Sequence, residues 1–151
     1  MSSKFTLSAG SKKTNKYLSV SAEETEAIGR QIGRALQPSS TVCLIGNLGA
    51  GKTTLTKGVV SEITGIPPRR VTSPTFTYLN IYEGNRTLYH FDCYRLNGSD
   101  DFLNRGFDEY FGRLCLIEWS EKIEDVLPKK RVVITIEYNG EDKRTVSYQE
   151  R

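Results

Sequence analysis

Apolar positions near the start of the chain change from a strand-like to a helix-like period. Residues 16–20 alternate apolar and polar side chains as a short strand does. Ser21 and Glu24 then match a capping box, in which two residues satisfy each other's free backbone N–H groups at the start of a helix. Ile28 and Ile32 follow on one helical face. The pattern predicts a short strand followed by an amphipathic helix.

A second strand and helix are predicted directly afterwards. The apolar run at residues 41–45 has the length of a buried strand and leads into a glycine-rich turn at residues 46–53. A helix is expected to begin near Lys52, because apolar residues follow at every fourth position from Leu55. Gly65 and the two prolines after it end this helix.

The rest of the chain has the pattern of hairpins and short helices. The predicted elements are strands at 76–82 and 86–91, a helical stretch at 101–111 broken at Gly106, a strand at 114–117, a short helix at 121–127, and strands at 131–138 and 144–148. Alternation of strands and helices favours parallel pairing, whereas hairpins pair antiparallel. The predicted fold class is therefore α/β, with a mixed sheet that is parallel in its centre and antiparallel elsewhere.

Positive charge is concentrated at the start of the chain. The sequence has 21 Lys and Arg and 18 Asp and Glu, a formal net charge of +3. Four lysines and no acid lie within residues 1–16, which leaves 17 basic and 18 acidic residues for the remainder. A start rich in Ser and Lys is typical of a disordered segment. We expect a disordered basic leader at residues 1–15 and a single domain at residues 16–151, without a basic stripe on the folded part.

The composition favours a cytoplasmic protein. No run approaches the ~18 apolar residues of a membrane span, and the start has no apolar core of a secretory signal. The three cysteines, Cys43, Cys93 and Cys115, show neither CxxC nor zinc-ligand spacing. We interpret them as reduced thiols without a chemical role.

The glycine-rich turn carries the strongest chemical signal. Residues 46–53 match G-x-x-x-x-G-K-[ST] between a predicted strand and a predicted helix. Glycines permit backbone angles that point successive N–H groups into one hollow, and the helix adds the positive end of its dipole. Lys52 supplies a mobile charge for the β and γ phosphates, and the Thr53 hydroxyl is placed to ligate Mg²⁺. The predicted nucleotide-binding residues are Gly49, Ala50, Gly51, Lys52, Thr53 and Thr54.

A phosphate-binding loop of this kind needs an acidic partner on a neighbouring strand to hold Mg²⁺, directly or through water. Asp92 and Glu118 each close an apolar run. Spacing does not decide which of them ligates the metal: Glu118 suits the Walker B position, and Asp92 shares a strand face with His90 and is placed to orient water or metal. The guanine-specific pattern N-K-x-D does not occur, which favours ATP over GTP.

Four sequence blocks, in this order and spacing, closely resemble the TsaE (YjeE) family of bacteria. They are Gly46-Asn-Leu-Gly-Ala-Gly-Lys-Thr-Thr54, Ser73-Pro-Thr-Phe76, His90-Phe-Asp-Cys-Tyr-Arg95 and Ile117-Glu-Trp119. The first block alone is generic, but its combination with the other three is highly specific. The likeness extends over about residues 16–148.

The resemblance implies a P-loop NTPase-like three-layer sandwich and a role in synthesis of threonylcarbamoyladenosine in tRNA. Family members are slow Mg-ATPases that work with TsaD and TsaB, and TsaD transfers the threonylcarbamoyl group to the adenosine next to the anticodon. By motif position, the resemblance implies that Lys52 holds phosphate, that Thr53 and Glu118 hold Mg²⁺, and that Asp92 is needed for hydrolysis. The likeness also places Glu121 near the nucleotide and makes residues 73–75 a segment that senses the γ-phosphate.

Two positions depart from the pattern of that family. Asn47 replaces a common aspartate of the loop, and Ser120 replaces the usual proline after the tryptophan. Neither position is a predicted phosphate or metal ligand, so the expectation of nucleotide binding is unchanged. Loop rigidity and the fit to a partner are the properties they affect.

Two other functions use the same phosphate loop. A small-molecule or nucleoside kinase would need an acceptor base near the γ-phosphate, and Asp92 is a candidate for it. A purely nucleotide-gated binding module would not need Asp92 for any function. The chain shows no second substrate pocket or arginine-rich lid of the kind that a compact phosphotransferase uses to exclude water, which favours the ATPase.

Overall fold

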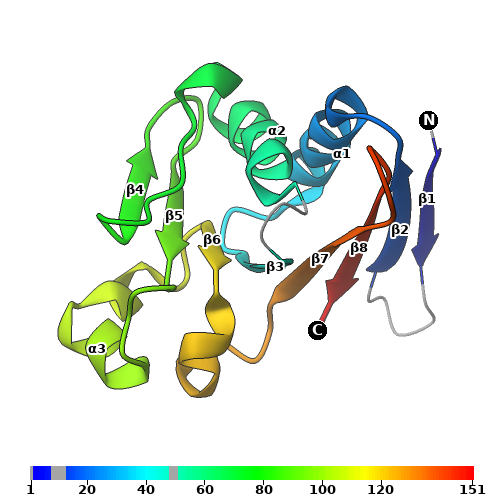
Figure 1. Ribbon diagram of the computed structural model, residues 1–151. Helices are drawn as coiled ribbons and strands as arrows, with labels where there is room; N and C mark the ends of the chain where they lie inside the picture. The colour runs from blue at the N-terminus through cyan, green and yellow to red at the C-terminus, as the bar shows by residue number, and fades with distance from the viewer. Residues whose placement is uncertain (1, 8–12, 48–50) are drawn as a thin grey trace.

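One mixed sheet runs through the whole structure, with helices on both of its faces (Figure 1). The computed structural model describes residues 2–7, 13–47 and 51–151. The strands are β1 (Ser2–Leu7), β2 (Lys13–Ser19), β3 (Thr41–Ile45), β4 (Leu79–Tyr82), β5 (Leu88–Asp92), β6 (Cys115–Glu118), β7 (Val132–Tyr138) and β8 (Arg144–Glu150). The α-helices are α1 (Ala22–Ala35), α2 (Lys52–Thr64) and α3 (Ser99–Asn104), and the 3₁₀ segments are η1 (Pro68–Arg70), η2 (Phe107–Tyr110) and η3 (Ser120–Val126).

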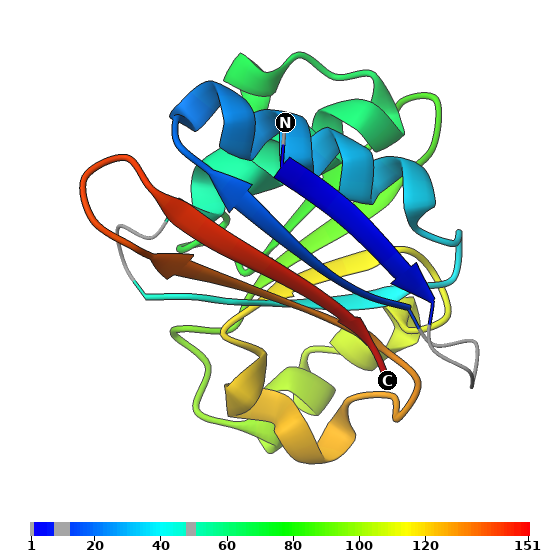
Figure 2. The same ribbon diagram turned by 90° about the vertical axis from the view of Figure 1, so that its right-hand side faces the viewer.

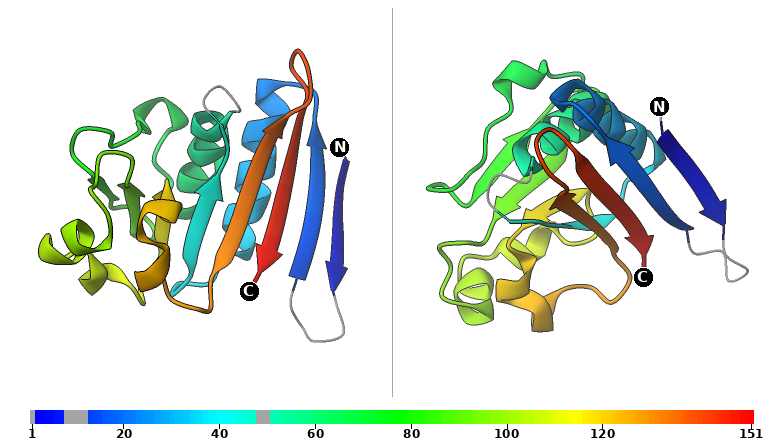
Figure 3. Two further views of the ribbon diagram at one scale, coloured as in Figure 1. Left: turned by 60° about the horizontal axis from the view of Figure 1, so that its bottom comes forward. Right: turned by 45° about the vertical axis from the view of Figure 1, so that its right-hand side comes forward.

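The eight strands lie in the order β1-β2-β8-β7-β3-β6-β5-β4. Strands β7, β3, β6 and β5 pair parallel to one another. The outer pairs β4–β5, β7–β8, β8–β2 and β2–β1 are antiparallel, and Figure 3 shows β7, β8, β2 and β1 side by side at one end of the sheet. The predicted fold class, with a parallel centre and antiparallel hairpins, is confirmed.

Two hydrophobic clusters fill the spaces on either side of the sheet. Figure 2 shows α1 and α2 on one side and α3 with η3 on the other. Strand β3 serves both clusters, because Val42 and Leu44 pack toward one cluster while Cys43 packs into the other. A strand covered on both faces reads as a continuous apolar run, which explains the unbroken pattern at residues 41–45.

The capping box at the start of α1 forms with one difference from the expectation. The backbone N–H of Glu24 donates to Ser21 Oγ at 3.1 Å, as predicted. The carboxylate of Glu24 accepts from the backbone N–H of Val20 at 3.0 Å, rather than from Ser21. The box therefore ties the end of β2 to the first turn of α1.

The lysine-rich start differs from the disordered leader expected at residues 1–15. Residues 2–7 form β1, and β2 begins at Lys13. Side chains of β2 alternate between buried and exposed, with Asn15, Tyr17 and Ser19 buried, and its backbone pairs with both β8 and β1. Composition alone missed this because the partner that orders β2 is a strand at the other end of the sequence.

Two further segments differ locally from the pattern, and a third agrees with it. The strand expected at 76–82 begins only at Leu79, because Tyr78 adopts a positive φ of 67° after a turn. The helical stretch at 101–111 breaks at Gly106, as predicted, with a φ of 76°. The short helix at 121–127 is a 3₁₀ segment. Among the described residues no helix is both long enough and apolar enough to cross a membrane.

Glycines bring α1 and α2 into close contact. A Cβ at Gly58 would lie 2.1 Å from the carbonyl oxygen of Glu26, and one at Gly29 would lie 2.3 Å from that of Leu55. Both neighbours are backbone atoms, so a side chain at either position would push the helices apart. This contact fixes α2 against α1, and both helices pack into the same hydrophobic cluster as one face of the sheet.

We expect Gly58→Ala to destabilise the protein by about 1–3 kcal/mol through overpacking, although alanine favours helix more than glycine does. Urea unfolding followed by circular dichroism measures the effect. Gly33→Ala is the matched control, because the nearest atom there is 3.1 Å away and the decrease in stability should be smaller. Equal or greater stability of Gly58→Ala would contradict the close packing.

Candidate nucleotide-binding site

A cavity of about 520 Å³ lies at the carboxyl ends of β5 and β6, next to the start of α2. The position follows from the topology, since parallel strands that share a direction end on one edge of the sheet. The cavity brings together six of the predicted site residues with five others. Its lining comprises Gly51, Lys52, Thr53, Thr54, Ser73, Thr75, Asp92, Tyr94, Glu118, Trp119 and Arg144.

Three predicted site residues are not among those that line the cavity. Gly49 and Ala50 lie outside the described residues. Glu121 lies in η3 with an exposed side chain. The beginning of α1 comes near the loop: a Cβ at Gly51 would lie 4.0 Å from Cγ2 of Thr25.

The loop before α2 depends on glycine at its two ends. A Cβ at Gly46 would lie 2.7 Å from Cγ2 and 2.8 Å from the carbonyl oxygen of Ile136 in β7, so only glycine fits against that strand. Gly51 has a φ of 100°, which a side chain strains. Gly51 is also the N-cap, and no side chain caps α2 there. The first N–H groups of α2 therefore have no side-chain cap, and they lie at the positive end of the helix dipole.

Asp92 and Glu118 lie directly beside each other on adjacent strands. They are paired in the parallel register of β5 and β6, and both are buried, with 5% and 4% exposure. The Oδ1 atom of Asp92 accepts from the backbone N–H of Tyr94 at 2.9 Å, and Oδ2 lies 3.4 Å from the hydroxyl of Thr75. Hydrogen bonds therefore fix the position of this carboxylate.

Glu118 has two neighbours on a single carboxylate oxygen. Its Oε2 lies 2.6 Å from Nε2 of His90 and accepts from the Ser73 hydroxyl at 3.1 Å. An ionised carboxylate only accepts hydrogen bonds, so Nε2 of His90 carries a proton here. His90 Nδ1 is buried and has no hydrogen-bond partner among the described residues. His90 thus supports Glu118 on the neighbouring strand, although it shares a strand with Asp92.

The carboxylate of Glu118 is held in its charged form. Burial raises its pKa, but the hydrogen bond and charge of His90, the charge of Lys52 and the hydrogen bond of Ser73 together lower the pKa below its ordinary value. Charged Glu118 is therefore the state that the cavity stabilises at neutral pH.

Lys52 is buried at the first position of α2 and points along the cavity wall. Its Nζ lies 4.6 Å from the ring centroid of Trp119, a distance at which a cation is attracted to an aromatic face. Trp119 has a positive φ of 58° where the chain turns from β6 into η3. The ring of Tyr94, which follows β5, lies 4.9 Å from the Trp119 ring. Trp119 thus belongs to the site wall and not only to the core.

The oxygen atoms in the cavity suit a magnesium ion. Mg²⁺ prefers hard oxygen ligands and keeps several of its waters, so one or two carboxylates and a hydroxyl are sufficient protein ligands. Glu118, Asp92 and Thr53 supply that set. No group of three or more His, Cys, Asp or Glu side chains in the described ranges is arranged to enclose a metal by itself. Cys93 follows Asp92, but burial raises the pKa of its thiol to about 12, so it stays neutral.

The structure adds two residues that sequence reasoning did not assign to the site. Arg144 reaches the cavity from β8, and its guanidinium lies 4.7 Å from the ring centroid of Tyr138. Tyr94 lies in the sequence block at residues 90–95, but the block gave no reason to assign the tyrosine itself to the site. Arg144 has no local motif that would identify it, because its place in the site depends on which strands lie next to α2.

The family model described as "Threonylcarbamoyl adenosine biosynthesis protein TsaE" matches residues 19–146. The chain belongs to the TsaE family. This TsaE-family protein is 43% identical over 136 residues to the tRNA threonylcarbamoyladenosine biosynthesis protein TsaE of Bacillus subtilis, covering 88% of this chain and 84% of that one. It is 40% identical over 132 residues to the protein of the same name from Treponema pallidum, covering 86% and 96%.

A solved structure shares the fold of this TsaE-family protein. The crystal structure of Bacillus subtilis YdiB matches with a TM-score of 0.76 and 38% sequence identity, over 92% of this chain and 86% of that chain. The resemblance inferred from the four sequence blocks is thereby confirmed, and the family has a role in threonylcarbamoyladenosine biosynthesis.

The lowered pKa of Glu118 predicts how stability changes in acid. A carboxyl whose pKa is lower in the folded state contributes stability above its ordinary value of 4.5, and this is lost as the pH falls through the folded value. We expect Glu118→Gln to flatten the loss of unfolding free energy below pH 4.5, by up to about 1.4 kcal/mol per pH unit. Urea unfolding between about pH 3 and 6 measures the slope. Glu121→Gln, at an exposed residue, should keep the wild-type dependence of the unfolding free energy on pH. The same dependence in Glu118→Gln as in the wild type would contradict the lowered pKa of Glu118.

Proposed function

We propose that this TsaE-family protein binds Mg-ATP and hydrolyses it slowly, acting with TsaD and TsaB in threonylcarbamoylation of the adenosine next to the tRNA anticodon. The observation that supports this most is the meeting of Lys52, Asp92 and Glu118 in one cavity at the start of α2. Family membership supplies the pathway. The site of action is the cytoplasm, and tRNA is reached through the complex.

The phosphates of ATP are held by the start of α2 and by Lys52. Backbone N–H groups without a side-chain cap suit an anion, and the helix dipole adds to their attraction. Lys52 is already ordered against Trp119. Its ammonium group contributes the charge for the β and γ phosphates, and Gly51, Thr53 and Thr54 line the same side of the cavity.

Thr53 and Glu118 hold the magnesium ion in this proposal, and Asp92 orients the water that attacks the γ-phosphate. Glu118 suits the metal because it is charged and has one oxygen outside its contacts with His90 and Ser73. Asp92 suits the water because the N–H of Tyr94 and the hydroxyl of Thr75 fix its orientation. A bound magnesium ion neutralises the negative charge that develops on the phosphate oxygens.

Partner proteins sense the nucleotide through the segment at residues 73–76. Ser73 contacts Glu118 and Thr75 contacts Asp92, so both carboxylates hold the same short stretch of chain. The next residue, Phe76, is 77% exposed, and the guanidinium of Arg95 lies 4.4 Å from its ring. An exposed aromatic ring beside an arginine is typical of the residues that dominate protein interfaces. Contacts at the two carboxylates therefore position Phe76 for TsaD or TsaB.

A pair of variants tests the proposed division between binding and turnover. We expect Lys52→Ala to weaken Mg-ATP affinity about 10- to 100-fold, because the variant has no ammonium group to pair with the phosphates. Asp92→Ala should retain affinity but reduce turnover by about 100-fold or more. Isothermal titration calorimetry and release of inorganic phosphate measure the two effects.

Lys57→Ala is the matched control, since Lys57 lies on the same helix and does not line the cavity. With ATP labelled on its γ-phosphate, the ATPase proposal predicts that the label appears in inorganic phosphate. Label transferred to an added acceptor would favour a kinase instead, and full function of Asp92→Ala would favour a binding module. Failure of the wild type to bind Mg-ATP would overturn the proposal.

We expect Phe76→Ala to remove the stimulation of turnover by TsaD and TsaB while intrinsic turnover and ATP affinity stay unchanged. The reason is that Phe76 is exposed and contacts neither carboxylate. Phosphate release with and without the partner proteins measures this. Ile81→Ala is the control, because Ile81 is also exposed, at 46%, and lies on β4 away from the cavity lining. Undiminished stimulation of Phe76→Ala would contradict the proposed interface.

A further inference from the structure

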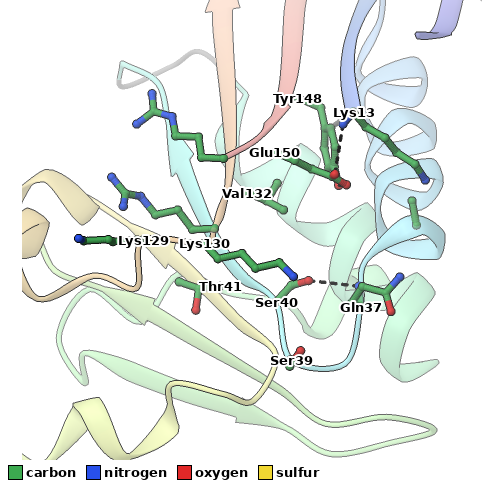
Figure 4. A pocket seen from close by; sticks show the side chains of 13 residues that line it. Lys13, Gln37, Ser39, Ser40, Thr41, Lys129, Lys130, Val132, Tyr148 and Glu150 are labelled. Atoms are coloured by element: carbon green, nitrogen blue, oxygen red, sulfur yellow. Dashed lines mark hydrogen bonds between the residues drawn. The ribbon is translucent and has the colours of Figure 1, made fainter. Parts of the chain in front are cut away.

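A second and larger cavity, of about 940 Å³, lies at the opposite end of the sheet from the nucleotide-binding cavity. It opens at the amino ends of β3 and β7. Four chain segments meet there: the connection after α1, the residues before β7, the end of β8 and the start of β2 (Figure 4). No residue lines both cavities.

Basic side chains dominate the lining of this second cavity. Among the described residues the lining has the cationic side chains Lys13, Lys129, Lys130, Arg131 and Arg151 and one acidic side chain, Glu150. The carboxylate of Glu150 accepts from the backbone N–H of Lys13 at 3.1 Å and from the Tyr148 hydroxyl at 3.0 Å. This carboxylate is therefore already hydrogen-bonded within the protein.

Two of the lysines have their charge directed to solvent. Lys129 and Lys130 are exposed, and neither forms an ion pair with any carboxylate of the described residues. Figure 4 shows Lys130 extending across the opening toward Ser40. Arg131, by contrast, pairs with Glu124 and donates to the carbonyl of Pro128, which fixes the backbone that carries the two lysines.

The remaining lining is suited to phosphate and not to bases or apolar side chains. The hydroxyls of Ser39 and Ser40 lie along one wall, where Thr41 is only 3% exposed, and hydroxyls with Lys and Arg are the usual partners of phosphodiester oxygens. Tyr148, the one aromatic residue of the lining, is only 2% exposed, so it offers no face on which a base can stack.

We propose that this basic cavity binds the phosphodiester backbone of RNA, without reading its sequence. Several cations spread around a cavity of larger volume than the nucleotide site suit a run of phosphates more than one phosphate group. An acidic protein segment fits less well, because such segments bind through apolar anchors as well as charge, and the lining residues Val132 and Tyr148 are only 7% and 2% exposed. The family has a role in tRNA modification. In this proposal the cavity adds a direct contact with tRNA, separate from the nucleotide, to the access that the complex provides.

Fluorescence anisotropy of the full chain with an unmodified tRNA transcript, over a range of salt concentrations, tests the proposal. We expect wild-type affinity to fall steeply with salt. The double variant Lys129→Glu/Lys130→Glu should lower affinity at least about 10-fold and reduce the salt slope by about 2, because each lysine neutralises one phosphate. Mg-ATP should not displace the RNA, and an RNA of equal length and scrambled sequence should bind equally.

Arg69→Glu/Arg70→Glu is the matched control, with the same change of net charge at exposed residues of η1 outside both cavities. It should keep most of the wild-type affinity. Mg-ATP binding by both double variants shows that they are folded. Equal reductions in affinity in the two double variants, displacement by Mg-ATP, or tighter binding of polyglutamate than of RNA would each overturn the proposal, the last in favour of an acidic protein partner.

Discussion

The burial of two carboxylates side by side is the constraint on which the rest of the site depends. Parallel pairing of β5 and β6 places Asp92 opposite Glu118, and both are almost fully enclosed. Removing a carboxylate from water costs several kcal/mol unless charges and hydrogen bonds replace the solvent. His90, Ser73 and Lys52 provide that replacement for Glu118. The first residue of α2, the strands β5 and β6 and the segment after η1 are therefore held in one arrangement by a single electrostatic requirement.

The same contacts connect the nucleotide site to the surface. Ser73 and Thr75 direct their hydroxyls to the two carboxylates, and Phe76 follows at once with its ring in solvent against Arg95. In our proposal, a ligand that binds to the two carboxylates also changes the hydrogen bonds that hold Ser73 and Thr75 in place. A slow ATPase that reports its nucleotide state needs such a link, because the energy of the phosphate contacts must reach a partner.

The sheet also separates the two proposed binding surfaces. The nucleotide cavity lies where the parallel strands end, and the basic cavity lies where β3 and β7 begin. Helices α1 and α2, in close contact through Gly29 and Gly58, join the two ends along one face. In our proposals, RNA at the basic cavity and Mg-ATP at the nucleotide cavity bind to different cations. Lys52 therefore remains available to the nucleotide.

The sequence by itself predicted most of the elements, the glycine-rich turn before Lys52 and the strand-end acids Asp92 and Glu118, because periodicity and motif spacing are carried by residues close together in the chain. It also identified the family. Only the tertiary structure decided that the two acids are register partners, that Arg144 enters the nucleotide cavity, and that residues 2–7 and 13–15 belong to strands. The basic cavity was missed for the same reason: charge counted along the chain showed no stripe, yet folding gathers Lys129 with Lys13 from the other end of the sequence. These features depend on contacts between residues far apart in the sequence, and no local sequence pattern contains that information.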